Sequence, residues 1–103
     1  MSLPITFRPE ARAELVEAWA WYEEQRPGLG DDLAACVEAA IGKAARQPDA
    51  YVEVHEGVRR VIVRRFPYGV FYVVEAGELL VLAVAHGRRR PHYWRERAPT
   101  RSR

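Results

Sequence analysis

The sequence predicts one α+β domain in which an N-terminal strand precedes an antiparallel helical hairpin packed on a mainly antiparallel sheet (β-α-α-β-β-β). Two observations carry this prediction. Apolar residues recur at helical spacing over residues 11–44, whereas Val, Ile, Phe and Tyr dominate short segments after residue 50. A length of 103 residues fits a single domain spanning 1–103, with a flexible tail expected over 98–103.

The first strand is expected at residues 3–7, and a helix follows with Pro9 in its first turn. The helix ends near Arg26, because Pro27 disfavours helical geometry in the residue before it. Trp21 lies at the flank of the apolar stripe, where it covers the helix edge or meets a partner. The stripe itself consists of Ala11, Leu15, Ala18, Trp19 and Tyr22.

A turn is expected at residues 27–30, and Asp31 and Asp32 then begin a second helix, where carboxylates meet free backbone N–H groups. Pro48 ends this helix. Cys36 is the only cysteine, so an internal disulfide and a multi-cysteine metal site are excluded. It lies on the apolar stripe of the helix and is interpreted as a core residue. The stripe comprises Leu33, Cys36, Val37, Ala40, Ile41 and Ala44.

The remaining chain is rich in strand-forming residues, and its apolar segments are 51–54, 58–66, 69–76 and 78–86. Val70–Val74 and Leu79–Ala85 are nearly continuous apolar runs, which predicts that both sheet faces are covered. The helical hairpin covers one face; the C-terminal segment, a second copy or another protein must cover part of the other. A short helix or turn is expected over 91–97. Four aromatic residues are assigned to the core: Trp19, Tyr22, Phe66 and Phe71.

Charge is divided unevenly along the chain. Residues 1–56 carry five basic and eleven acidic side chains, a net charge of −6, whereas residues 57–103 carry eleven arginines and three acids, a net charge of +8. Such asymmetry points to an anionic partner, and arginine suits bidentate recognition of carboxylate or phosphate. The alternative is that acidic helices and basic strands only solvate their own outer faces.

No motif for a resident cofactor or metal is present. The Gly-rich segment lacks the Lys-Ser/Thr of a phosphate loop, the three histidines are far apart, and serine occurs only at Ser2 and Ser102. No apolar run is long enough to span a bilayer, and no signal peptide is apparent at the N-terminus. We therefore expect no metal, no cofactor, no membrane association and a cytoplasmic location.

The basic half contains two groups of arginines interleaved with aromatic residues. Strand alternation would place Arg59 and Arg65 on one face, with Arg60 and Arg64 on the other. One hypothesis is RNA binding with cleavage, which needs a proton acceptor and an acid, and the candidates for these roles are His86, His92, Tyr93 and Glu96. The other hypothesis is a protein-binding module whose cationic surface engages an acidic partner.

Several short motifs occur in a fixed order along the chain: Trp21-Tyr22-Glu23, Pro27-Gly28-Leu29-Gly30, Arg65-Phe66-Pro67-Tyr68, Phe71-Tyr72, Ala83-Val84-Ala85-His86, Arg90-Pro91, Tyr93-Trp94 and Arg97. This ordered set resembles the RelE/ParE superfamily of type II toxin–antitoxin toxins, and its ParE-like branch most closely. The resemblance covers the chain from about Ile5 to Arg97.

The resemblance implies a growth-arresting toxin that forms a hetero-oligomer with a cognate antitoxin. ParE-like members are linked to inhibition of DNA gyrase, whereas RelE-like members cut mRNA on the ribosome. The only lysine, Lys43, lies on the second helix, so the strand lysines expected of a RelE-like nuclease are absent. We therefore expect a gyrase inhibitor that is not an enzyme; the alternatives are a ribosome-dependent mRNA endonuclease and an inactive, antitoxin-binding member.

Site residues follow from these expectations. Target contact is assigned to Arg59, Arg65, Arg88, Arg89, Arg90, Tyr93, Trp94, Arg95 and Arg97. Antitoxin contact is assigned to Trp21, Val70 and Tyr72. If the protein is instead a ribonuclease, the catalytic candidates are His86, Tyr93, Arg64 and Arg65.

Overall fold

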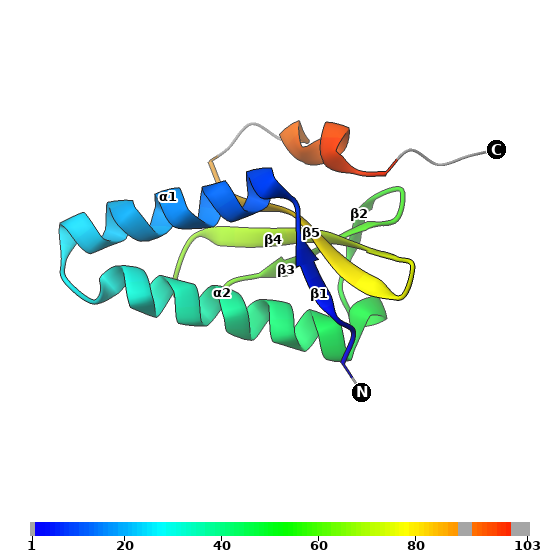
Figure 1. Ribbon diagram of the computed structural model, residues 1–103, viewed down its shortest axis with the longest axis horizontal. Helices are drawn as coiled ribbons and strands as arrows, with labels where there is room; N and C mark the ends of the chain where they lie inside the picture. Colours follow the sequence, from blue (N-terminus) through cyan, green and yellow to red (C-terminus); the bar gives the residue numbers. More distant parts are fainter. Residues whose placement is uncertain (1, 89–91, 100–103) are drawn as a thin grey trace.

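The computed structural model describes residues 2–88 and 92–99 and confirms the predicted α+β class (Figure 1). Four strands follow the helices, one more than predicted, because residues 53–55 form a short edge strand. The elements are β1 (Ile5–Phe7), α1 (Pro9–Gln25), α2 (Leu29–Arg46), the 3-10 turn η1 (Pro48–Ala50), β2 (Glu53–His55), β3 (Val58–Ile62), β4 (Tyr68–Glu75), β5 (Glu78–His86) and the 3-10 turn η2 (Tyr93–Arg97).

The five strands form one sheet in the order β1-β5-β4-β3-β2. β1 runs parallel to β5, and the other neighbouring strands are antiparallel. β1 pairs only with residues 79–81 of β5. In the described chain, the rest of that edge, toward His86, therefore has no neighbouring strand. Side chains must satisfy the backbone groups there, because buried N–H and C=O groups need partners.

The turn between the helices is shorter than predicted, because α2 begins at Leu29 rather than at the aspartates. Gly28 precedes it with a φ of 90°, a conformation that glycine adopts readily. The Glu23 carboxylate accepts hydrogen bonds from the backbone N–H groups of Gly28 and Gly30, at 3.0 and 2.8 Å. A side chain of α1 therefore satisfies N–H groups at the start of α2 and fixes the hairpin.

The main core lies between the helical hairpin and one face of the sheet. Strand alternation directs Val61, Val70, Tyr72 and Val81 toward the helices, where each is at most 4% exposed. Phe66 is also buried, as predicted, but Trp19 is exposed and its indole N–H donates to Asp31. The buried helical residues that face this core are Ala11, Ala18, Leu33, Val37, Ala40, Ile41, Ala44 and Ala45.

The opposite face of the sheet is covered in part by the C-terminal segment. Trp94 of η2 is 3% exposed and packs with Val58, Val73, Leu82 and Ala83 in a second buried cluster. The C-terminal segment therefore shields part of this apolar sheet face from solvent. In the described part of the chain, no helix is long and apolar enough to cross a membrane.

β3 ends at Ile62, so the predicted strand over 58–66 is four residues too long. The backbone leaves the strand at Val63, whose N–H donates to the Tyr68 carbonyl, and Arg65 adopts a φ of 72°. Alternation along a strand therefore does not decide where Arg64 and Arg65 point.

Candidate functional site

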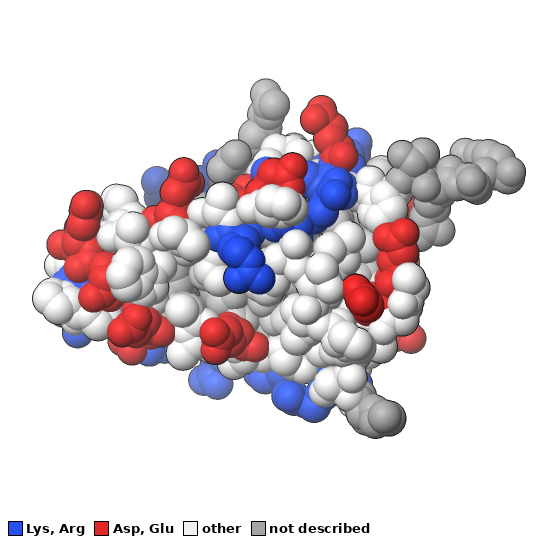
Figure 2. All heavy atoms as spheres, in the orientation of Figure 1, with Lys and Arg blue, Asp and Glu red and all other residues white. Residues whose placement is uncertain are grey.

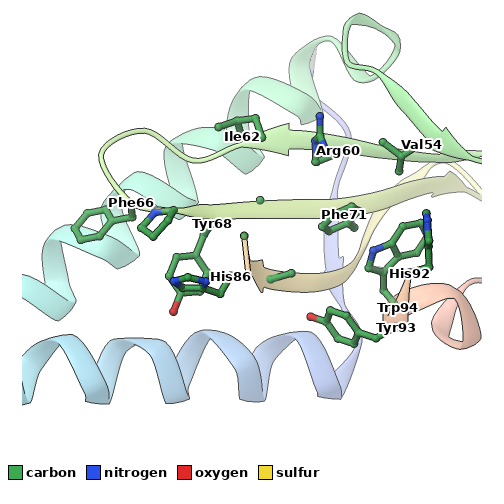
Figure 3. Close-up of a pocket in the computed structure, with 14 residues that line it drawn as sticks. Val54, Arg60, Ile62, Phe66, Tyr68, Phe71, His86, His92, Tyr93 and Trp94 are labelled. Carbon is green, nitrogen blue, oxygen red and sulfur yellow. The ribbon is translucent and has the colours of Figure 1, made fainter. Parts of the chain in front are cut away.

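A groove of about 500 Å³ lies beside η2 on the open face of the sheet, which is the face opposite the helices (Figure 3). Alternate positions of β3 and β4 form its floor, and β2, the β3–β4 connection, the end of β5 and η2 surround it. The lining residues are Val54, Arg60, Ile62, Phe66, Pro67, Tyr68, Gly69, Phe71, Ala85, His86, Gly87, His92, Tyr93 and Trp94.

Gly69 leaves room on the floor of the groove for the side chain of Arg60. It pairs with Ile62 across the ladder and lies diagonally opposite Arg60, which pairs with Phe71. A Cβ at Gly69 would lie 3.4 Å from Cγ and 3.5 Å from Cδ of Arg60. The arginine methylenes therefore lie across the bare glycine backbone.

Arg60 is the one arginine or lysine among the described lining residues. Its Nε is buried and has no hydrogen-bond partner, and within residues 2–88 and 92–99 no carboxylate lies within 4.0 Å of its nitrogens. A buried guanidinium nitrogen without an acceptor is costly. The groove therefore presents an uncompensated positive charge in largely apolar surroundings.

His86 and Tyr68 form one wall of the groove (Figure 3). Their rings meet edge to face with centroids 5.2 Å apart, and His86 Nδ1 accepts a hydrogen bond from the backbone N–H of Arg88 at 3.0 Å. That bond requires Nδ1 to be unprotonated. Burial, together with the neighbouring Tyr22, raises the pKa of the Tyr68 hydroxyl, so it stays a neutral hydrogen-bonding group.

On the η2 side, Tyr93 is held by Glu14 of α1. The Tyr93 hydroxyl donates to Glu14 Oε2 at 2.8 Å, while Glu14 Oε1 accepts from Arg97 Nη1 and from the backbone N–H of Val84, each at 3.0 Å. Arg97 also donates to the Leu82 carbonyl at 3.1 Å. Two backbone groups on the edge of β5 that β1 leaves unpaired, the Val84 N–H and the Leu82 carbonyl, are satisfied in this way.

The Glu14–Arg97 ion pair is largely withdrawn from solvent, with side chains 11% and 15% exposed. Burial acts to lower the pKa of the Arg97 guanidinium, but its hydrogen bond and charge interaction with Glu14 outweigh this, and the pKa is raised overall. Arg97 therefore remains a cation, and its ion pair with Glu14 holds η2 against α1.

Two other residues predicted to contact a target are engaged within the chain. Trp94 stacks on Phe71 with ring centroids 4.8 Å apart and is almost fully buried, so the structure places it in the second core. Arg59 donates to the Tyr51 carbonyl at 2.6 Å and forms an ion pair with Glu53 at 3.7 Å. Its charge, like that of Arg97, is already compensated.

The remaining predicted target residues are not gathered in the groove. Arg88 and Arg95 are exposed, whereas Arg89 and Arg90 lie outside the described residues. Arg65 pairs with Asp32 near the beginning of α2, at 3.7 Å, so it does not form one surface with Arg59. Figure 2 shows the face that carries the helices, where acidic side chains are scattered along the hairpin and basic ones gather in smaller groups.

Two of the three residues predicted to contact an antitoxin lie inside the main core. Val70 and Tyr72 are fully buried beneath the helices, because their strand positions face the main core. The Tyr72 hydroxyl donates to the Pro48 carbonyl at 2.8 Å, and burial raises its pKa to about 12. Trp21 remains available, with 56% of its surface exposed.

Of the candidate catalytic residues, the structure brings His86 and Tyr93 to the same groove and leaves Arg64 and Arg65 outside it. Sequence reasoning missed Glu14 as a site residue, since it reads as one more acid on a solvated helix face. For Arg60, a usable signal exists: it alternates with the apolar residues Val58 and Ile62 on one strand face. Among the described residues, no group of three His, Cys, Asp or Glu could hold a metal ion.

Comparison with solved structures shows that the chain has a known fold. The chain superposes on a structure of the chromosomal ParDE toxin–antitoxin system from P. aeruginosa with a TM-score of 0.72 and 15% identity, covering 82% of this chain and 96% of the other. It is also similar to the toxin–antitoxin complex RelBE2 from Mycobacterium tuberculosis, with a TM-score of 0.55 and 23% identity over 84% of this chain and 99% of that one. The chain thus shares its fold with chains of these two toxin–antitoxin structures.

The family follows from the sequence match. Residues 5–91 match the family described as "ParE toxin of type II toxin-antitoxin system, parDE". The chain therefore belongs to the ParE toxin family, which confirms the resemblance to the ParE-like branch. No match to an individual curated protein was found.

Proposed function

We propose that this ParE-family toxin arrests growth by inhibiting DNA gyrase, without cleaving nucleic acid itself, and that a cognate antitoxin neutralises it. Family membership supports the toxin–antitoxin role. The gyrase target rests on the ParE-like resemblance, which links such chains to gyrase.

The non-enzymatic part of the proposal is supported by the hydrogen bonds that already engage the acid–base groups of the groove within the chain. The Tyr93 hydroxyl already donates to Glu14, and His86 Nδ1 already accepts from Arg88. Arg60 is the single cation among the described lining residues, and arginine stays protonated. A metal-free ribonuclease needs an acid, a base and several phosphate-binding cations, and this arrangement supplies few of them.

The test is induced expression followed by two parallel readouts. We expect growth arrest with a DNA-break response, and we expect purified toxin to block supercoiling by gyrase and to accumulate cleaved DNA. Replacing the exposed pair Arg88 and Arg95 with alanine should weaken gyrase inhibition, whereas Arg46→Ala on α2 should not. Unaffected gyrase together with arrested translation would overturn the proposal, and unchanged growth would identify an inactive member.

One observation favours a second candidate, a ribosome-dependent mRNA endonuclease. His86 and Tyr93 line the same groove as Arg60, so an imidazole, a phenol and a guanidinium share one surface. In that case induced cells should contain cut mRNA, and Tyr93→Phe or His86→Ala should abolish cutting. Intact transcripts during growth arrest would eliminate this candidate.

A further inference from the structure

The groove on the open sheet face combines an exposed apolar strip with one uncompensated guanidinium. Ile62 is 61% exposed on its floor, and Val54 and Pro67 continue the apolar surface on either side. Arg60 lies between them with its Nε buried and unpaired (Figure 3). An occupant that suits this surface carries one negative charge flanked by apolar groups.

A nucleic acid fits this description poorly. A polynucleotide presents a charge at every phosphate and is held by several cations, but the described lining offers only Arg60. Bases stack on accessible aromatic faces, and Trp94, the one tryptophan among the described lining residues, offers none because it is buried against Phe71. Arg64, Arg65, Arg88 and Arg95 do not line the groove.

A peptide carboxylate fits much better. An Asp or Glu side chain can accept two parallel hydrogen bonds from a guanidinium, and such a pair is strongest where water is excluded. Gly69 has no side chain at the point where the Arg60 methylenes cross it, so Arg60 can lie close to the sheet beneath an extended chain. The flanking residues of that chain would cover Ile62 and remove its exposed apolar surface from water.

We propose that the groove is the docking site of an extended segment of the antitoxin, anchored by one Asp or Glu that pairs with Arg60 and flanked by apolar residues that cover Ile62. This inference rests on the proposed function, in which an antitoxin neutralises the chain. It adds the chemistry that the antitoxin segment must carry and the residue that receives it.

The test uses the full-length toxin and the purified product of the reading frame adjacent to the toxin gene as the probe. Its affinity is measured by calorimetry for wild type, Arg60→Leu and Arg60→Lys, with Arg46→Leu as a control that removes the same charge from α2. Removing one partner of a buried charge pair commonly weakens binding by about 30-fold or more. We expect that loss for Arg60→Leu, a smaller loss for Arg60→Lys and less than about 3-fold for Arg46→Leu.

The apolar part is tested with a pair of matched variants. Ile62→Asp and Val16→Asp each place a carboxylate at a strongly exposed apolar position, 61% and 59% exposed respectively, so both should fold, as thermal unfolding can verify. We expect only Ile62→Asp to reduce antitoxin binding, by about 10-fold or more, because it adds an acid beside the docked one.

The outcomes separate the two proposals. Tight antitoxin binding that is equal for wild type, Arg60→Leu and Ile62→Asp would overturn this inference and leave the toxin–antitoxin role intact. Absence of any antitoxin binding by a wild-type chain that arrests growth would overturn both the docking site and neutralisation. Binding of a single-stranded RNA oligonucleotide that is lost in Arg60→Leu would overturn it in favour of a nucleic-acid groove.

Discussion

Replacing Glu14 with alanine should be among the most destabilising single changes outside the main core. Its two oxygens accept hydrogen bonds from Tyr93, Arg97 and the backbone N–H of Val84, at 2.8 to 3.0 Å. The alanine would leave the Arg97 guanidinium, only 15% exposed, without its counter-charge. Removing one partner of a buried ion pair costs about 3–5 kcal/mol.

That cost is large compared with the total stability of about 5–15 kcal/mol expected for a domain of this size. At about 4–8 °C per kcal/mol, the melting temperature should fall by at least about 12 °C. Glu14→Gln keeps the shape and part of the hydrogen bonding, so its loss should be smaller. Urea unfolding followed by circular dichroism measures the free energy of each variant.

Glu17 provides the matched control, since it is an exposed glutamate on the same helix without an ion pair or hydrogen bond to the rest of the described chain. Glu17→Ala should change stability by less than about 0.5 kcal/mol. The double variant Glu14→Ala/Arg97→Met should recover part of the loss, because it removes the unpaired charge. Equal unfolding free energies for Glu14→Ala and Glu17→Ala would refute the role assigned to Glu14.

Three further predictions concern packing and pH. Gly30→Ala would place a Cβ 2.5 Å from the Trp19 carbonyl oxygen, so forcing the helices apart should cost about 1–3 kcal/mol in urea unfolding. Trp94→Ala should cost about 3–5 kcal/mol and increase binding of the dye ANS, because it uncovers the open sheet face. Because folding raises the Tyr72 pKa from 10.0 to about 12, its contribution is complete below pH 10 and is lost as pH rises toward 12. Tyr72→Phe should therefore flatten the pH dependence of stability in that window, and an unchanged slope would contradict the assignment.

Most of the fold was predictable from local pattern. The two helical stripes, the proline that separates them and the apolar strand segments each depend on neighbouring residues, and the structure places them as expected. The errors occurred where local pattern is ambiguous. β2 has only three residues, and β3 stops at Ile62 because the following turn, with Arg65 at positive φ, interrupts an apparently continuous strand.

The candidate site was predictable only in part. His86 and Tyr93 could be named from their residue types, and both line the groove. The sequence could not show which sheet face Val70 and Tyr72 occupy, because both faces of this strand are apolar. Only the packed structure shows that they lie on the face covered by the helices. Trp94 likewise reads as a contact residue on a basic segment, but it fills the second core.

By itself, the sequence determined the class of fold, the helical hairpin and the separation of acidic and basic halves, since these depend on composition and short-range periodicity. Only the tertiary structure decided which arginines form ion pairs within the chain and which do not. Arg97 is neutralised by Glu14, 83 positions away in the chain, whereas Arg60, two positions before the end of β3, meets no carboxylate in the described structure. Electrostatic pairing depends on distances between segments that only folding brings together, so a count of arginines could not show that Arg97 is paired and Arg60 is not.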